Sequence, residues 1–215
     1  MKEKYRTIFS YGEDEIIINK SRFIGYAKPI NSEEEAIDFI EEIKEKHRDA
    51  THNVYAYVFG ENSNIQRFSD DGEPSGTAGI PALEVLKKED LRNVVVVITR
   101  YFGGIKLGGG GLIRAYTKGA KIGVDAGVIV DMVLHREISF QVDYNQYGKI
   151  ENFLMTNEYI TNDVVFEDLV TISLYVAVDE LEKFKNSITD LTSGNSIIAE
   201  LDDRHLPILD GKRLL

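Results

Sequence analysis

Apolar and polar residues follow two different patterns along the chain, which divide it into two parts. In the first part, helical spacing and β-branched runs predict a mixed order of strands and helices. The expected elements are two strands within 15–30, a helix from 32, strands at 54–59 and 65–68, a helix at 81–88, a strand at 94–102 and a helix at 112–126.

The helix that begins at residue 32 carries clear local signals. Ser32 is a suitable N-cap, and Glu35 three residues later completes a capping box. Apolar residues at helical spacing predict one buried face, formed by Ala36, Ile37, Ile40 and Ile43.

The run from Val94 to Phe102 is apolar and β-branched without alternation. This pattern is typical of a strand buried on both faces. The run leads into a glycine-rich loop at 103–111, and the following helix is expected to stop at Gly127.

The second part predicts strands at 138–142, 159–166, 170–178 and 195–201, with helices at 145–157 and 179–191. Asp179 is the expected cap of the later helix, whose apolar face is Leu181, Phe184, Ile188 and Leu191. The order β-α-β-β-α-β indicates a ferredoxin-like arrangement. We therefore expect an N-terminal domain at 1–134, a ferredoxin-like domain at 135–205 and a loose tail at 206–215.

The net charge of −11 limits what the chain can bind, because an acidic protein repels nucleic acid at long range. Residues 136–215 hold 7 basic and 15 acidic side chains, against 18 and 21 in residues 1–135. Any anion site is therefore expected in the first part, as a local patch. The absence of cysteine excludes disulfides and thiolate metal sites. No signal-peptide pattern and no long apolar run is present, so we expect a cytoplasmic protein with no membrane partner.

One acid-free segment, Thr99 to Lys121, contains five basic residues and six glycines ahead of a helix. Backbone amides at a helix N-terminus favour anions, and glycine lets a ligand approach them closely. We predict phosphate contacts from Arg100, Lys106, Arg114 and Lys118, and amide donors at Gly108, Gly109, Gly110 and Gly111. Tyr101, Phe102 and Tyr116 could stack bases. The alternative is a flexible connector, since the spacing matches neither a P-loop nor a dinucleotide fingerprint.

A second candidate is the loop at 69–81. Asp70, Asp71 and Glu73 could bind Mg²⁺, and Ser75 and Thr77 could contact phosphate. The alternative is an ordinary polar turn, which Asp-Gly and Glu-Pro favour. His52 could serve as a general base or as a hydrogen-bonded structural histidine.

Four segments together resemble the signature blocks of the IMPACT family, in particular its bacterial YigZ-like (YvyE-like) branch. They are SRFIG at 21–25, THNVYAY at 51–57, SDDGEPSGTAGIP at 69–81 and VVVVITRYFGGIKLGGGGLIRAY at 94–116. The resemblance covers residues 15–130, and residues 136–200 are similar to the smaller C-terminal domain of the bacterial members.

The resemblance implies an α+β fold. The N-terminal domain is expected to be like the second domain of a small-subunit ribosomal protein and domain four of elongation factor G. The C-terminal domain is expected to be ferredoxin-like, similar to the last domain of that factor. Both relatives contact ribosomal RNA, which implies a translation-linked role by analogy. Eukaryotic members regulate translation through a starvation kinase, using an extra N-terminal domain that we expect this chain to lack.

Three functions stay open. The favoured one is binding of RNA or another phosphate-bearing ligand, with the ribosome as a partner and without catalysis. The second is a Mg²⁺-dependent enzyme acting on a phosphorylated small molecule, with His52 or Asp71 as the base. The third is a protein-interaction adaptor that uses the acidic C-terminal part.

Overall fold

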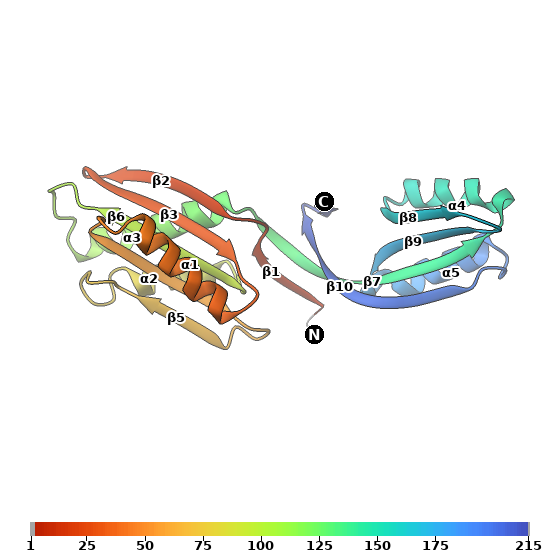
Figure 1. Cartoon of the computed structure of the whole chain (residues 1–215), viewed down its shortest axis with the longest axis horizontal. Helices are drawn as coiled ribbons and strands as arrows, with labels where there is room; N and C mark the ends of the chain where they lie inside the picture. Colours follow the sequence, from red (N-terminus) through yellow and green to blue (C-terminus); the bar gives the residue numbers. More distant parts are fainter. Residues whose placement is uncertain (1–2, 215) are drawn as a thin grey trace. The chain divides into compact units, whose positions relative to one another are not determined.

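The computed structural model describes residues 3–214, which divide into two compact units (Figure 1). The first unit comprises Tyr5–Met132 with Pro207–Lys212, and the second comprises Val133–Leu206 with short terminal stretches. Both units mix α-helices with antiparallel sheets, as expected for an α+β protein. Among the described residues, no helix combines the length and apolar character that crossing a membrane requires.

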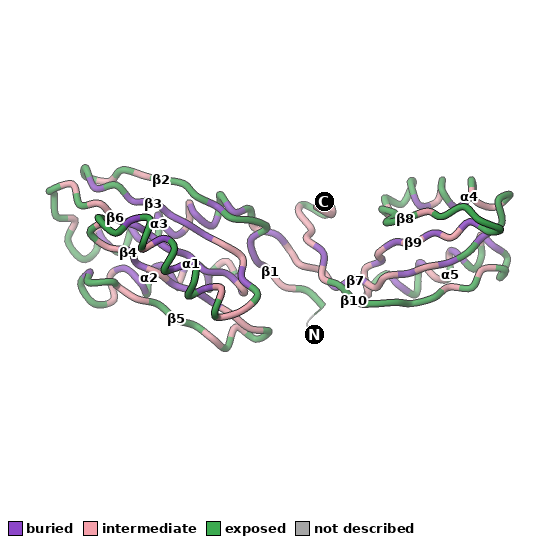
Figure 2. The backbone as a smooth tube through the Cα atoms, in the orientation of Figure 1, coloured by how far each residue is buried: buried purple, intermediate pink, exposed green. Residues whose placement is uncertain are grey.

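The first unit is built on a five-stranded antiparallel sheet in the order β2-β3-β6-β4-β5. Its strands are β2 (Gly12–Ile18), β3 (Ser21–Pro29), β4 (His52–Phe59), β5 (Ile65–Ser69) and β6 (Val94–Tyr101); β1 (Lys4–Ile8) precedes them. The central strand β6 is buried at every position except Tyr101, which confirms the prediction of a strand covered on both faces. Buried positions also dominate β3 and β4 (Figure 2).

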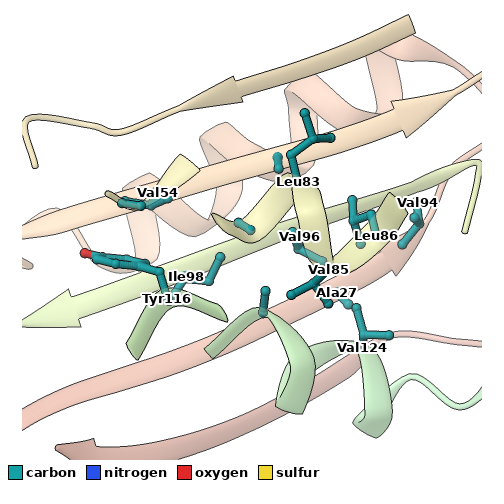
Figure 3. Packing of buried hydrophobic residues seen from close by; sticks show 14 of the residues in the cluster. Ala27, Val54, Leu83, Val85, Leu86, Val94, Val96, Ile98, Tyr116 and Val124 are labelled. Carbon is teal, nitrogen blue, oxygen red and sulfur yellow. The ribbon is translucent and has the colours of Figure 1, made fainter. Parts of the chain in front are cut away.

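Helices cover both faces of this sheet. On one face, α1 (Glu33–Lys46) packs on Val95 and Val97 of β6. On the other, α2 (Gly79–Lys88) and α3 (Gly109–Ala126) pack on Val94, Val96 and Ile98. Figure 3 shows this second layer, with Tyr116 of α3 at one end of the apolar cluster.

Helix α1 confirms the predicted cap and corrects part of the predicted face. The side chain of Ser32 accepts a hydrogen bond from the Glu35 amide, 3.1 Å away. The Glu35 carboxylate reaches back to the amide of Asn31. Ile37 is half exposed, at 50%, and Phe39 takes its place in the core.

Helix α3 begins earlier than the sequence predicts. Gly109, Gly110 and Gly111 form its first turn, where a loop was expected, and Gly108 is the N-cap with a φ of 70°. A positive φ is readily adopted by glycine, which explains this residue at that position. The helix ends at Gly127, as predicted.

Glycines let α3 lie directly against the backbone of β2 and β3. A Cβ added to Gly25 would be 2.0 Å from the carbonyl oxygen of Gly119, and one added to Gly12 would be 2.2 Å from the nitrogen of Gly127. Added to Gly123, it would lie 2.8 Å from the backbone of Gly25. Only glycine allows this separation, so these residues set the position of α3 on the sheet.

The second unit has the predicted element order. It contains β7 (Ile129–Val142), α4 (Tyr144–Thr156), β8 (Thr161–Phe166), β9 (Val170–Ala177), α5 (Leu181–Leu191) and β10 (Ile198–Leu209), with the strand order β10-β7-β9-β8. Strands β7 and β10 are longer than expected and each continues into the first unit.

Two local predictions in this part were wrong. The tail is not loose, because β10 continues to Leu209 and β11 follows at Lys212–Arg213. Asp179 lies within a short 3₁₀ turn, and α5 has no side-chain cap.

Replacing Gly25 with alanine is expected to destabilise the first unit by about 3 kcal/mol, because the clash is with backbone that cannot rotate away. Urea denaturation followed by circular dichroism measures this change. The matched control is Gly148→Ala in α4, where an added Cβ meets nothing within 4 Å. That variant should gain up to about 1 kcal/mol from helix propensity. Equal stability of Gly25→Ala and the wild type would contradict the close contact.

Candidate anion-binding site

The acid-free segment runs from the end of β6 through the loop at 102–108 into α3. Lys106, Arg114 and Lys118 are exposed, and none of them forms an ion pair with a residue that the structure describes. Lys121 differs, because its ammonium lies 3.0 Å from Glu89 and 2.6 Å from Asp125. The usable positive charge of the segment is therefore concentrated near the start of α3.

The N-terminus of α3 presents backbone amides without a side-chain cap. The first helical bond is donated by Leu112 to the carbonyl of Gly108, at 2.9 Å. The amides of Gly109, Gly110 and Gly111 therefore have no helical acceptor. A Cβ added to Gly108 or Gly109 would meet nothing within 4 Å, so the space beside them is open. The first turn contains no acidic residue, which favours an anion there.

Arg114 belongs to the same surface as these amides. Its guanidinium lies 3.7 Å from the position that a Cβ on Gly110 would take. Lys118 lies one helical turn further along α3 and is also exposed. The structure thus brings together the glycines with two of the four predicted basic residues, and Lys106 lies in the loop that precedes them.

Arg100, the remaining basic residue of that set, is placed differently. It is only 5% exposed, and its guanidinium lies 2.5 Å from the Glu73 carboxylate. In the sheet it is directly opposite Phe23 on β3 and His52 on β4. Its Nε is buried without an acceptor among the described residues. A contact between Arg100 and a phosphate would compete with the Glu73 ion pair.

Glu73 joins three separate parts of the first unit. Its Oε1 accepts hydrogen bonds from Arg100 and from the hydroxyl of Tyr116 on α3, the latter at 2.7 Å. The Nε2 of His52 lies 3.7 Å from the same oxygen. Burial, followed by the Glu73 hydrogen bond, raises the pKa of Tyr116 far above its usual range. Tyr116 therefore remains a hydrogen-bond donor at any physiological pH.

The other carboxylates of the 69–81 loop have their own partners. Asp70 accepts from the amides of Gly76, Ala78 and Gly79, and so caps the start of α2. The Oδ2 of Asp71 accepts from the amide of Asn53 at 2.6 Å.

The magnesium site at Asp70, Asp71 and Glu73 stays a prediction, which these hydrogen bonds do not favour. Each of the three carboxylates is bound within the fold, and the described residues contain no group of three His, Asp or Glu side chains placed to hold a metal. Through these hydrogen bonds Asp70 and Asp71 shape the loop, as the alternative of a polar turn also predicts.

The three remaining predicted residues differ in their surroundings: His52 lies beside Glu73, Thr77 bonds within its own loop and Ser75 is exposed. The Thr77 hydroxyl donates to the carbonyl of Pro74 at 2.6 Å, whereas Ser75 is exposed. The Nδ1 of His52 lies 2.7 Å from the carbonyl of Asp71 and donates to it. Their predicted contacts with a ligand stay predictions.

The three aromatic residues of the segment differ in access. Tyr116 is fully buried, and the Tyr101 hydroxyl lies 2.8 Å from Nδ1 of His47. Only Phe102 is substantially exposed, at 47%.

Sequence reasoning missed Ser21 and Thr51, which hold the start of the glycine-rich loop. The Ser21 hydroxyl accepts from the amide of Gly103 at 3.1 Å, and the Thr51 hydroxyl accepts from Phe102 at 3.0 Å. Ser21 is the first residue of the SRFIG block and Thr51 the first of the THNVYAY block. The two blocks could have pointed to these residues, but the sequence did not show which amides their hydroxyls bind.

Comparison with known proteins places this site in a family. The Impact N-terminal domain matches residues 19–124, which contain the whole site, and a domain of unknown function (DUF1949) matches residues 140–195. A Bacillus subtilis protein, IMPACT family member YvyE, is 47% identical over 200 residues, covering 93% of this chain and 92% of that protein. The chain belongs to the IMPACT family.

Other similar proteins also match most of the chain. Escherichia coli YigZ is 31% identical over 190 residues, which cover 86% of this chain and 92% of YigZ. A crystal structure described as a hypothetical protein superposes with a TM-score of 0.59 at 28% identity, covering 94% of this chain and 99% of the other. The similarity of this IMPACT family member to these relatives thus extends over most of the chain.

Removing the charge of Glu73 is expected to destabilise the protein, because it leaves Arg100 buried and unpaired. Glu73→Gln should lower the free energy of unfolding by about 3 kcal/mol, measured by urea denaturation. The double variant Glu73→Gln with Arg100→Met should regain most of this loss, because it removes the buried charge and keeps an acceptor for Tyr116.

Glu84→Gln is the matched control, since it breaks an exposed pair with Lys87 on α2 and should leave stability unchanged. A Glu73→Gln variant as stable as the wild type, or a double variant less stable than Glu73→Gln, would argue against the buried ion pair.

Proposed function

We propose that this IMPACT family member binds a phosphate-bearing ligand, RNA above all, at the N-terminus of α3. The observation that carries the proposal is the first turn of α3, where the amides of Gly109–Gly111 have no helical acceptor and the space beside Gly109 is open. Arg114 and Lys118 lie on the same helix, are exposed, and form no ion pair with a residue that the structure describes. Helix N-terminal amides and nearby cations are the groups that bind phosphate in many proteins.

The charge distribution supports a local site rather than a broad basic surface. The chain as a whole is at −11, yet Thr99–Lys121 contains no acidic residue. Long-range attraction to a polyanion is therefore weak, and binding depends on contacts close to α3. Affinity should consequently be modest and strongly dependent on salt.

A link to translation and to the ribosome as a partner is part of the proposal. The second unit has the β-α-β-β-α-β order and a strand order that fits the ferredoxin-like arrangement. The first unit is proposed to be like elongation factor G domain four. Contact with ribosomal RNA is therefore proposed from analogy of fold.

Magnesium-dependent catalysis receives no support from the site, because the carboxylates expected to hold the metal are bound within the fold. An adaptor role for the acidic second unit has no specific contact in its favour. We therefore propose binding alone.

The proposal predicts a salt dependence whose slope falls when individual basic side chains are removed. If Lys106, Arg114 and Lys118 neutralise about three phosphates of single-stranded RNA, log K should fall with log salt at a slope of roughly −2. The combined variant Arg114→Gln and Lys118→Gln should reduce the slope to about −0.7 and weaken binding at low salt. Fluorescence anisotropy with a labelled, unstructured RNA measures both.

Lys183→Gln is the control, because it removes one exposed charge from α5 in the second unit. It should leave the slope unchanged. Absence of RNA binding by the wild type at low salt, or an equal effect of Lys183→Gln, would refute the proposed site.

A further inference from the structure

Phe102 is an exposed aromatic ring at the start of the glycine-rich loop. It is 47% exposed, and the guanidinium of Arg100 lies over its ring at 5.4 Å from the centroid. The same guanidinium lies 5.3 Å from the ring centroid of buried Phe23. Phe102 is thus supported from within the fold, while much of its surface remains in contact with water.

The backbone around Phe102 is fixed before any ligand arrives. The Phe102 amide donates to the Thr51 hydroxyl, and the Gly103 amide donates to the Ser21 hydroxyl. Gly103 also packs against the backbone of Lys20, since an added Cβ would lie 2.0 Å from it. An exposed apolar ring held this way loses little conformational freedom on binding.

The supporting cation is not itself available to a ligand. Arg100 is buried and paired with Glu73, so its charge is already balanced. What Phe102 offers is therefore a flat apolar surface. Six residues, 103–108, separate it from Gly109, the first residue of α3, which limits the distance between the two to about 25 Å.

We propose that Phe102 stacks an unpaired base of the RNA whose phosphates bind at α3, which makes single-stranded RNA the ligand class. This inference rests on the proposed function. A single strand of RNA spans the loop in a few nucleotides, so it can place an unpaired base on Phe102 while its phosphates bind at α3. The bases of duplex RNA are already stacked on each other. A polyphosphate without bases could bind only the amides of α3, and a duplex has no unpaired base to stack on Phe102.

The test compares three ligands of equal length: a single-stranded RNA, the same RNA in a duplex, and an abasic ribose-phosphate oligomer. Phe102→Ala should weaken binding of single-stranded RNA at least about fivefold, because one stacked base contributes roughly 1–3 kcal/mol. Its affinity for the abasic oligomer should be unchanged. Phe102→Tyr should retain the wild-type affinity, and a thermal melt confirms that each variant is folded.

A second measurement uses the absence of tryptophan from the chain. In Phe102→Trp the only indole should be quenched by single-stranded RNA and not by the abasic oligomer. Phe166→Trp is the control, since Phe166 is also exposed, at 54%, but lies on β8 in the second unit. It should show no quenching.

The possible failures are distinguishable. If the wild type binds neither RNA nor the abasic oligomer, the proposed function itself is wrong. If RNA binds but Phe102→Ala binds it equally well, only the stacking role is overturned. An equal loss of RNA and abasic binding in Phe102→Ala would also overturn it, because the ring would then merely support the loop.

Discussion

The ion pair between Arg100 and Glu73 is the contact on which the rest of the first unit's site depends. Arg100 belongs to the central strand β6, Glu73 to the loop before α2, and the Tyr116 hydroxyl that completes the network belongs to α3. A buried charge without a partner is costly, so the hydrogen bonds to Glu73 hold these three segments together. The network fixes the direction in which β6 ends and α3 begins, and hence the course of the glycine-rich loop between them.

A second constraint places α3 with equal firmness. Gly12, Gly25 and Gly123 allow the backbone of α3 to contact the backbone of β2 and β3 at these points. Because these contacts hold the C-terminal half of α3, the position of the helix does not depend on a cap at its first turn, which is open to solvent. An acidic protein can thus have a small cationic surface lined by amides, because its acidic residues lie outside Thr99–Lys121.

Much of the fold was predictable from local patterns, and the pairing of charges was not. The apolar run of β6 and the alternation in β9 predict strands because burial on two faces and on one face leave different patterns. The start of α3 was misplaced because glycines have weak helix propensity, and here tertiary packing overrides it.

The site was only partly predictable for a related reason. A list of basic residues does not distinguish Arg100, buried opposite Phe23 and His52, from exposed Arg114. That distinction depends on strand register and on Glu73, which lies 27 residues away in sequence. Likewise, the sequence favours Asp70 and Asp71 as metal ligands, and only the structure shows that both accept hydrogen bonds from backbone amides.

The central claim is that the first-turn amides of α3 bind phosphate, and amide chemical shifts report on it directly. Titration of ¹⁵N-labelled protein with inorganic tripolyphosphate at low salt should shift the resonances of Gly109, Gly110 and Gly111, with saturation and with the largest changes in the protein. Unchanged glycine resonances, or larger shifts at exposed lysines elsewhere, would contradict the account.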